Sequence, residues 1–190
     1  MVNIMILIGS TRPNRFGPHV AQWIKLQSEQ IEGAKFTLVD VQDLELPMLD
    51  EPQPPVMGNY QNAHTKAWSK LVDAADGFVF VTPEYNHSSS PALINAIDYL
   101  AAEWRYKPSA FVSYGADAGG ARAIEHLRQI GGNLSLYDIY DSISIVNSWT
   151  QRDEQGGFIP TEDQNDRAYK LLTKLTFWAK EMRASRAKLV

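Results

Sequence analysis

A chain of 190 residues, with 44% hydrophobic and 21% charged residues, is long enough for one globular domain with a full core. Its formal net charge of -4, without a basic block, argues against nucleic acid or an anionic membrane as a partner. The absence of cysteine excludes disulfides, thiolate catalysis, Cys-ligated zinc and iron–sulfur clusters. We expect a single domain over residues 1–190. Because no apolar run is long enough for a signal peptide or a membrane span, we also expect a cytoplasmic protein.

The first third of the chain begins with a strand, a polar turn and a helix. Residues 2–8 are nearly all apolar, which is typical of a central parallel strand buried on both faces. The turn GSTRPNRFG (Gly9 to Gly17) follows, and Pro18 suits the first turn of a helix because its missing N–H costs nothing there. The alternating pattern of residues 35–41 predicts a second strand near an edge of a sheet.

Residues 44–61 form a long, proline-rich connection that also carries apolar side chains, among them Leu46, Met48 and Leu49. A connection of this length in a compact domain is usually functional or disordered. The apolar side chains offer anchors, so we favour a lid or a subunit-contact arm over free disorder. A helix is expected next, over residues 63–75.

The stretch VFVTPEYNHSSSPALINA, residues 79–96, has the most informative local pattern. Its apolar run up to Thr82 predicts a buried strand, and Pro91 with Ser90 as N-cap predicts the start of a helix. Eight residues, 83–90, lie between these elements, whereas such turns usually need about two to six. The extra length, with an aromatic residue and an amide, favours a binding loop over an ordinary turn.

The rest of the chain continues the alternation of strands and helices. We predict, in order, a strand at 109–114, a glycine-rich turn at 115–120, a helix at 121–130 closed by Gly131 and Gly132, an edge strand at 139–146 and a long loop at 147–160. The last helix begins at a capping box made by Thr161 and Gln164, and its pattern buries Trp178. Trp104 and Trp149 could line a site or an interface.

Five strands alternating with five helices predict an α/β fold with a doubly wound parallel sheet. With so few strands the usual order is 2-1-3-4-5, which places a ligand crevice between the first and third strands at their carboxyl ends. The loops at that crevice would be residues 9–17 and 83–90. These are two of the most polar short loops in the chain, and their coincidence at the crevice predicts a ligand site there.

The turn at residues 9–17 leads into a helix N-terminus, where backbone N–H groups and the helix dipole favour an anion. Ser10 and Thr11 add hydroxyl donors, and Arg12 and Arg15 add guanidinium donors suited to phosphate. The alternative is two solvated surface arginines beside a capping serine. The spacing fits neither a Walker A loop nor GxGxxG, which disfavours ATP hydrolysis and an ordinary NAD site.

The loop at residues 83–90 offers Tyr85 for stacking, and Asn86 with backbone amides for bonding the edge of a flat heterocycle. Glu84 could be a general base, but a carboxylate that accepts backbone N–H bonds is an equal alternative. The glycines of residues 115–120 could let the backbone approach a planar ligand, or could simply make the turn. Scattered histidines predict no metal site, and we assign no catalytic side chain.

Three motifs resemble the NADPH-dependent FMN reductase family, a flavodoxin-like group that includes azo, quinone and chromate reductases. They are GSTR at Gly9 to Arg12, TPEYNHSSSPALINAID at Thr82 to Asp98, and SYGADAGGARAIEHLR at Ser113 to Arg128. The second motif is the most specific, and together the motifs span most of the chain in the family's order. The resemblance implies a flavodoxin-like three-layer sandwich with strand order 2-1-3-4-5, and FMN and NADPH as cofactors.

The same resemblance implies three groups of FMN contacts. The phosphate would be held by Ser10, Arg12 and the loop amides up to Gly17, which include those of Arg15 and Phe16. The isoalloxazine would be lined by Pro83, Glu84, Tyr85 and Asn86, largely through backbone atoms, and the other side would be closed by Tyr114, Gly115 and Gly119. Many relatives have Ser and Asn where this chain has Arg15 and Gly17, and Lys where it has Ile94. Arg15 could replace the serine as a phosphate donor.

The resemblance further implies an oxidoreductase that passes a hydride from NAD(P)H to bound FMN and on to a flavin, quinone or similar small acceptor. The protein would contribute positioning and tuning. The main alternative is an FMN-bound electron-transfer protein without NAD(P)H activity, and the next is a module that lost the flavin. Family members are dimers or tetramers built on the helix after the PEYN-like loop, so we expect a homodimer or homotetramer, in which Asp98 and Arg122 are either interface residues or plain surface charges.

Overall fold

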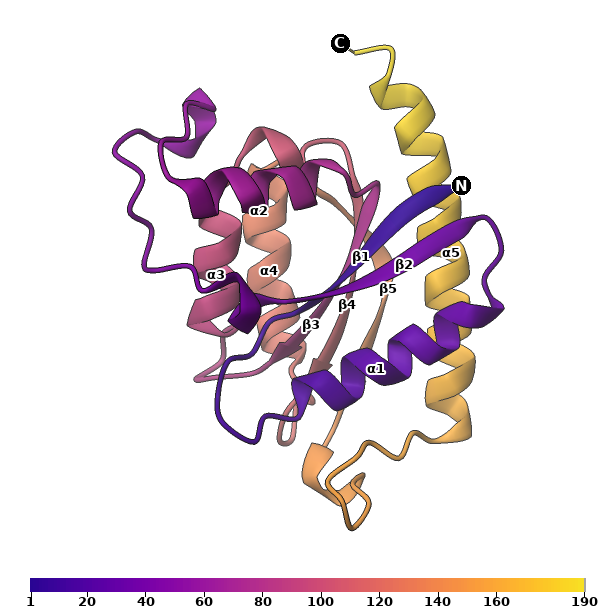
Figure 1. The fold of residues 1–190 in the computed structure, drawn as a ribbon. Coiled ribbons are helices and arrows are strands. Elements are labelled where there is room, and N and C mark those ends of the chain that lie inside the picture. The colour runs from indigo at the N-terminus through magenta and orange to yellow at the C-terminus, as the bar shows by residue number, and fades with distance from the viewer. Residues whose placement is uncertain (190) are drawn as a thin grey trace.

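The computed structural model describes residues 1–189, in which five strands alternate with five α-helices (Figure 1). The strands are β1 (Val2–Ile8), β2 (Ala34–Asp40), β3 (Gly77–Pro83), β4 (Pro108–Tyr114) and β5 (Tyr137–Ile145). The helices are α1 (Gly17–Gln27), α2 (Ala63–Asp73), α3 (Pro91–Asp98), α4 (Ala121–Asn133) and α5 (Glu162–Arg186). None of the helices within these residues has the length and apolar character to cross a membrane.

The strands form a single parallel sheet in the order β2-β1-β3-β4-β5, which confirms the predicted topology. The central strands are apolar along almost their whole length because both faces of the sheet are covered. The direction of winding reverses between β1 and β3, so the loops that follow these two strands leave the sheet side by side. The fold therefore places residues 9–16 beside residues 84–90.

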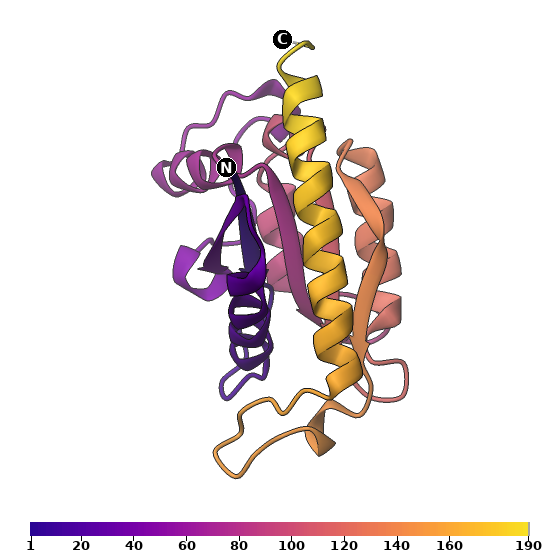
Figure 2. The same ribbon diagram turned by 90° about the vertical axis from the view of Figure 1, so that its right-hand side faces the viewer.

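Helices α1 and α5 cover one face of the sheet, and α2, α3 and α4 cover the other (Figures 1 and 2). Each face has its own core. Val20 and Leu172 lie in the core under α1 and α5, and Trp68, Leu93 and Leu127 lie in the core under the other three helices. Full burial of each such side chain stabilises the fold by about 1.5–3 kcal/mol.

The predicted helix starts are confirmed by their caps. Pro18 lies in the first turn of α1. The Ser90 hydroxyl accepts a hydrogen bond from the Leu93 amide at 3.1 Å, which caps α3. Thr161 and Gln164 form the predicted capping box of α5, with bonds of 3.2 and 2.8 Å.

Three local predictions were wrong. Gly131 and Gly132 do not close α4, which continues to Asn133, because tertiary packing outweighs the weak helix propensity of two glycines. Trp178 is 47% exposed, because the stripe of α5 that faces the sheet passes beside it. Trp104 lines no site or interface, since its fully buried ring packs against Phe78, with ring centroids 4.9 Å apart.

Candidate cofactor site

The two polar loops meet at the carboxyl ends of β1 and β3, as predicted. The Gly9 amide donates to the Val81 carbonyl at 2.8 Å, and the Ser90 hydroxyl donates to the Gly9 carbonyl. Farther out, the Arg12 guanidinium lies 6.0 Å from the centroid of the Tyr85 ring. The structure therefore joins a loop rich in anion donors to a loop that carries an aromatic ring.

Two hydroxyl groups lie at the start of α1. Ser10 is fully buried, and its Oγ accepts a hydrogen bond from the Tyr114 hydroxyl at 3.1 Å. Burial raises the pKa of Tyr114 to about 12, so this phenol keeps its proton at neutral pH. A Cβ added at Gly17 would lie 2.5 Å from Ser10 Oγ and 2.9 Å from the Tyr114 oxygen. Glycine at this position thus leaves a small cradle of donors at a helix N-terminus, which fits a phosphate.

The two arginines of the first loop have different surroundings. Arg15 is largely buried and forms a bidentate pair with Asp40, with distances of 2.8 and 2.6 Å, and it also donates to the Ser10 carbonyl at 2.5 Å. The hydrogen bonds with Asp40 raise the pKa of Arg15, which stays charged. Arg12 is exposed and forms no ion pair within residues 1–189. Arg15 therefore fixes the loop to the end of β2, whereas Arg12 is free to meet an anion.

The second loop carries a tight turn. Tyr85 and Ser88 exchange backbone hydrogen bonds of 2.9 and 3.0 Å across Asn86 (φ 51°) and His87 (φ 65°), the pattern of a type I′ turn. Asn and His tolerate positive φ better than most residues. The Ser88 hydroxyl lies 2.5 Å from His126 Nδ1 on α4, which ties the turn to the neighbouring helix. The turn holds Tyr85 at the edge of the site.

Glu84 occupies the position between this turn and α4. Its carboxylate pairs with the Arg122 guanidinium and accepts from the Arg122 amide at 3.3 Å, at the N-terminus of α4. The Glu84 amide in turn donates to the Tyr114 carbonyl at 3.1 Å. Of the two interpretations offered by the sequence, the geometry favours a carboxylate that accepts backbone and guanidinium N–H bonds over a free general base.

The glycine-rich loop after β4 contributes unequally to the site. Gly115 lines the cavity described below, and its amide donates to the Ile145 carbonyl at 3.2 Å. Gly119 has φ 58°, and an added Cβ would lie 2.9 Å from the Val146 amide nitrogen. Gly119 is therefore required for the close approach of this loop to the end of β5. Of the two roles offered by the sequence, this favours making the turn over approaching a planar ligand.

Residues missed by the sequence analysis come from the loop that follows β5. Arg152 was not predicted, yet its guanidinium lies 4.3 Å from the centroid of the Phe16 ring, and Arg152 lines the site with Ser148, which was also missed. Trp149, which the sequence offered as a residue that could line a site, does line it. Phe158 packs edge-on against Phe16, which anchors this loop over the start of α1. The signal available in the sequence was a long loop with an arginine and two aromatic residues after the fifth strand, whose end also lies at the carboxyl edge.

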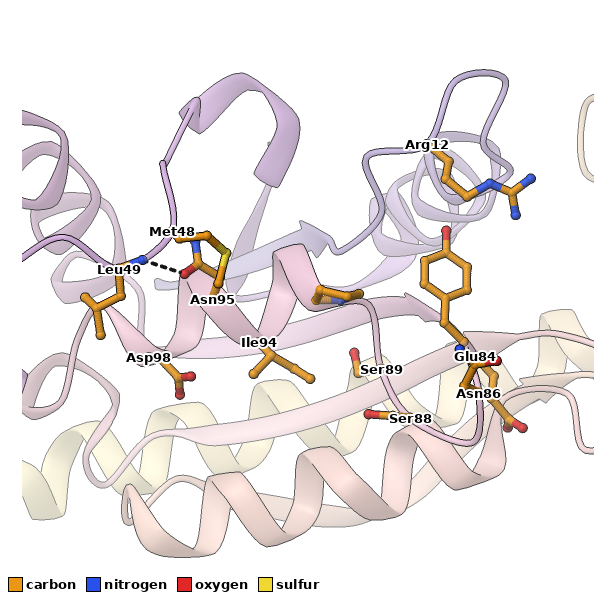
Figure 3. Close-up of a pocket in the computed structure, with 12 residues that line it drawn as sticks. Arg12, Met48, Leu49, Glu84, Asn86, Ser88, Ser89, Ile94, Asn95 and Asp98 are labelled. Carbon is orange, nitrogen blue, oxygen red and sulfur yellow. Dashed lines mark hydrogen bonds between the residues drawn. The ribbon is translucent and has the colours of Figure 1, made fainter.

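These loops enclose two cavities that share a wall. The smaller, about 210 Å³, lies between the loops after β1, β3, β4 and β5. The larger is a groove of about 850 Å³ along α3 and residues 48–49 (Figure 3). Arg12, Glu84 and Tyr85 line both. A ligand with an anionic end in the smaller cavity can therefore present its other end to the groove.

The family model for NADPH-dependent FMN reductases matches residues 2–151. The chain belongs to this family. It is accordingly a flavin-dependent NAD(P)H oxidoreductase with FMN and NADPH as cofactors, as the motifs predicted. Arg152 and Phe158 lie just beyond the matched residues.

Individual relatives agree with this assignment. The chain is 41% identical over 135 residues to an NAD(P)H-dependent FMN reductase of Schizosaccharomyces pombe, a match that covers 70% of this chain and 67% of that protein. It is 30% identical over 181 residues to an NADPH:quinone oxidoreductase of Arabidopsis thaliana, covering 92% and 90%. The solved structure of FerB, a flavoenzyme NAD(P)H:(acceptor) oxidoreductase from Paracoccus denitrificans, superposes with a TM-score of 0.74 at 18% identity, covering 96% and 99%. A flavodoxin, WrbA-like protein from Agrobacterium tumefaciens gives a TM-score of 0.57 at 15% identity, over 96% and 99%. Both share the flavodoxin-like fold.

Proposed function

We propose that this protein passes reducing equivalents from NAD(P)H to FMN in the smaller cavity and on to a flavin or quinone in the adjoining groove. The observation that carries the proposal is the pair of cavities with a common wall. One is lined by side chains that can donate hydrogen bonds to a phosphate, and the other is a groove open to solvent. The names of its relatives support both a flavin and a quinone as acceptor.

The residues present fit FMN in a definite orientation. The Ser10 hydroxyl, the Arg12 guanidinium and the first amides of α1 would hold the phosphate, because they supply neutral and charged donors at a helix N-terminus. Phe16 and Gly17 shape this cradle, and the Arg152 guanidinium lies over the Phe16 ring, where it would add positive charge near the phosphate.

The ring system would then lie against the loop after β3. Pro83, Glu84 and Asn86 would line it through the backbone, since the Glu84 carboxylate is already bonded to Arg122. Tyr85 stands at the boundary with the groove, and Tyr114 and Gly115 continue the cavity wall beside Pro83 and Glu84. Bound FMN supplies the redox chemistry, and these residues bind and orient it and exclude water.

Arg15 and Gly119 take supporting parts in this proposal. Arg15 would keep the first loop in place through its ion pair with Asp40. Its positive charge would add to the electrostatic field at the phosphate, but its guanidinium would not be a direct phosphate donor in place of the serine that many relatives have at this position. Gly119 would hold the fourth loop close to β5. The single-domain organisation, the cytoplasmic location and the homo-oligomeric state stay predictions from the sequence.

A visible spectrum of the purified protein, followed by anaerobic addition of NADPH, tests the proposal. We expect flavin absorption that bleaches on addition of NADPH and returns when a quinone is added. A colourless protein that takes up no FMN, or one whose flavin does not respond to NADPH, would contradict it. Flavin that is reduced by dithionite but not by NADPH would instead support the electron-transfer alternative.

A further inference from the structure

A clasp between α3 and residues 47–49 lies outside the contacts assigned to FMN. Asn95, in the middle of α3 and 9% exposed, uses both ends of its carboxamide. Its Oδ1 accepts from the Leu49 amide at 2.9 Å (Figure 3). Its Nδ2 donates to the Pro47 carbonyl at 2.7 Å. Because both partners are backbone groups, this one side chain fixes the path of the segment much as a neighbouring strand would.

A second anchor lies one helical turn farther along the chain. The Tyr99 hydroxyl donates to Asp50 Oδ1 at 2.9 Å and lies 3.2 Å from the Pro47 carbonyl. Asp50 is also bonded to Asn62 at 2.9 Å and to His64 at 3.0 Å. The segment is therefore held at two points, by side chains four residues apart on one face of the helix.

The clasp places two exposed apolar side chains beside the groove. Met48 and Leu49 are 77% and 41% exposed, and both line the groove together with Ile94 of α3 (Figure 3). Arg12 and Tyr85, by contrast, line the part that adjoins the cofactor cavity. A short acceptor can reach the shared wall without touching Met48 or Leu49, whereas a long acceptor extends along the groove toward them.

We propose that Asn95 is a positioning residue that holds Met48 and Leu49 as an apolar wall for the distal part of large, flat acceptors. The wall raises kcat/KM for multi-ring acceptors, because it adds apolar contact for them and none for single-ring acceptors. This inference rests on the proposed function, since it concerns the groove beside the FMN cavity.

The test compares two acceptors with the FMN-loaded full chain at saturating NADPH. For each variant, kcat and KM are measured with 1,4-benzoquinone, which has one ring, and 9,10-phenanthrenequinone, which has three. Asn95→Ala removes both bonds of the clasp, and the double variant Met48→Ala/Leu49→Ala removes the wall without disturbing a buried residue. Asn95→Asp can still accept from the Leu49 amide but cannot donate to the Pro47 carbonyl. Met57→Ala is the matched control, because this methionine belongs to the same connection, is 68% exposed and lies outside the groove lining.

We expect kcat/KM for phenanthrenequinone to fall roughly tenfold in Asn95→Ala and in the double variant, mainly through KM, with benzoquinone nearly unchanged. The kcat/KM of Asn95→Asp for phenanthrenequinone should lie between those of these variants and the wild type, and that of Met57→Ala should match the wild type.

An unchanged ratio of kcat/KM between the two quinones in both Asn95→Ala and the double variant would overturn the inference, as would an equal loss for both quinones. A change of oligomeric state on gel filtration with an unchanged ratio would also overturn it, in favour of a subunit contact. Failure to take up FMN would instead contradict the proposed function before any acceptor is compared.

Discussion

The two ends of the sheet differ in how their polar groups are used. At the amino end, Asp76 precedes β3 and accepts from the Asn3 amide at 2.9 Å, from Arg183 at 3.3 Å and from Arg186 at 3.0 Å. Lys107, which precedes β4, donates to the carbonyls of Val72 and Asp73 at 2.8 and 3.0 Å. The charged groups at this end are therefore bonded to the protein itself.

At the carboxyl end the guanidinium groups of Arg12 and Arg152 form no ion pair within residues 1–189. Both line the smaller cavity, as does Tyr114, whose hydroxyl donates to the buried Ser10 hydroxyl. At the amino end these charged groups are thus bonded to the protein itself, whereas the carboxyl end carries, beside the ion pairs Arg15–Asp40 and Glu84–Arg122, two guanidinium groups without a carboxylate partner in the described part of the chain. We infer that substitutions at the amino end change stability, whereas substitutions at the carboxyl end change FMN affinity.

The largest effect is expected from Asp76→Ala at the amino end. Asp76 is 7% exposed, and its loss leaves the guanidinium group of Arg186 without its carboxylate. We expect a loss of about 3 kcal/mol in the free energy of unfolding, measured by urea denaturation, with the Kd for FMN unchanged. Asp73→Ala, at an exposed position nearby, is the control and should stay within about 0.5 kcal/mol of the wild type. Weakened FMN binding in Asp76→Ala would break the division between the two ends.

Lys107 gives the amino end a pH signature. Burial lowers the pKa of Lys107 to about 8, from 10.5 in an unfolded chain. Between these two values the unfolded chain holds a proton that the folded protein has released, so stability rises with pH. Relative to Lys107→Met, the wild type should gain roughly 2–3 kcal/mol between about pH 7 and pH 10. Urea denaturation at a series of pH values measures this difference, and parallel curves for the two proteins would contradict it.

At the carboxyl end, Arg12→Ala should weaken FMN binding by roughly 10- to 100-fold, because a charge-assisted hydrogen bond to the phosphate is lost. The free energy of unfolding without FMN should not change, since Arg12 is exposed and unpaired. Fluorescence titration with FMN measures the Kd. Arg105→Ala, at another exposed arginine, controls for the loss of one positive charge. A change of the same size in Arg105→Ala would show that only net charge matters.

Arg152→Ala should have a smaller effect, a roughly three- to tenfold rise in the Kd for FMN. The guanidinium lies over the Phe16 ring and adds charge at the mouth of the smaller cavity. Arg152→Lys keeps the charge but loses the planar contact, so it should recover part of the affinity. If the alanine variant binds FMN as the wild type does at low salt, Arg152 has no part in the site.

Much of the fold was predictable from local patterns. Apolar runs identified the central strands, Ser90 and Thr161 identified two helix starts, and the alternation of elements fixed the strand order. The meeting of residues 9–17 and 83–90 then followed from topology, because the carboxyl ends of neighbouring parallel strands lie at the same edge of a sheet. These features depend on residues close in sequence or on the right-handed connection of parallel strands, so they could be predicted without knowing any contact between distant side chains.

Other features depended on pairs of residues far apart in the chain. Arg15 is bonded to Asp40, Glu84 to Arg122, Asn95 to Pro47 and Leu49, and Arg152 lies over Phe16. Such contacts decide whether a polar side chain is already bonded within the protein or remains available to bind a ligand. Periodicity describes only which face of an element a residue occupies. It does not say which of the chain's many carboxylates will form an ion pair with a given arginine. The sequence by itself determined the family, the strand order and the loops that form the site. Only the tertiary structure decided which arginines remain free to hold an anion, because that depends on which distant groups folding brings within hydrogen-bond distance.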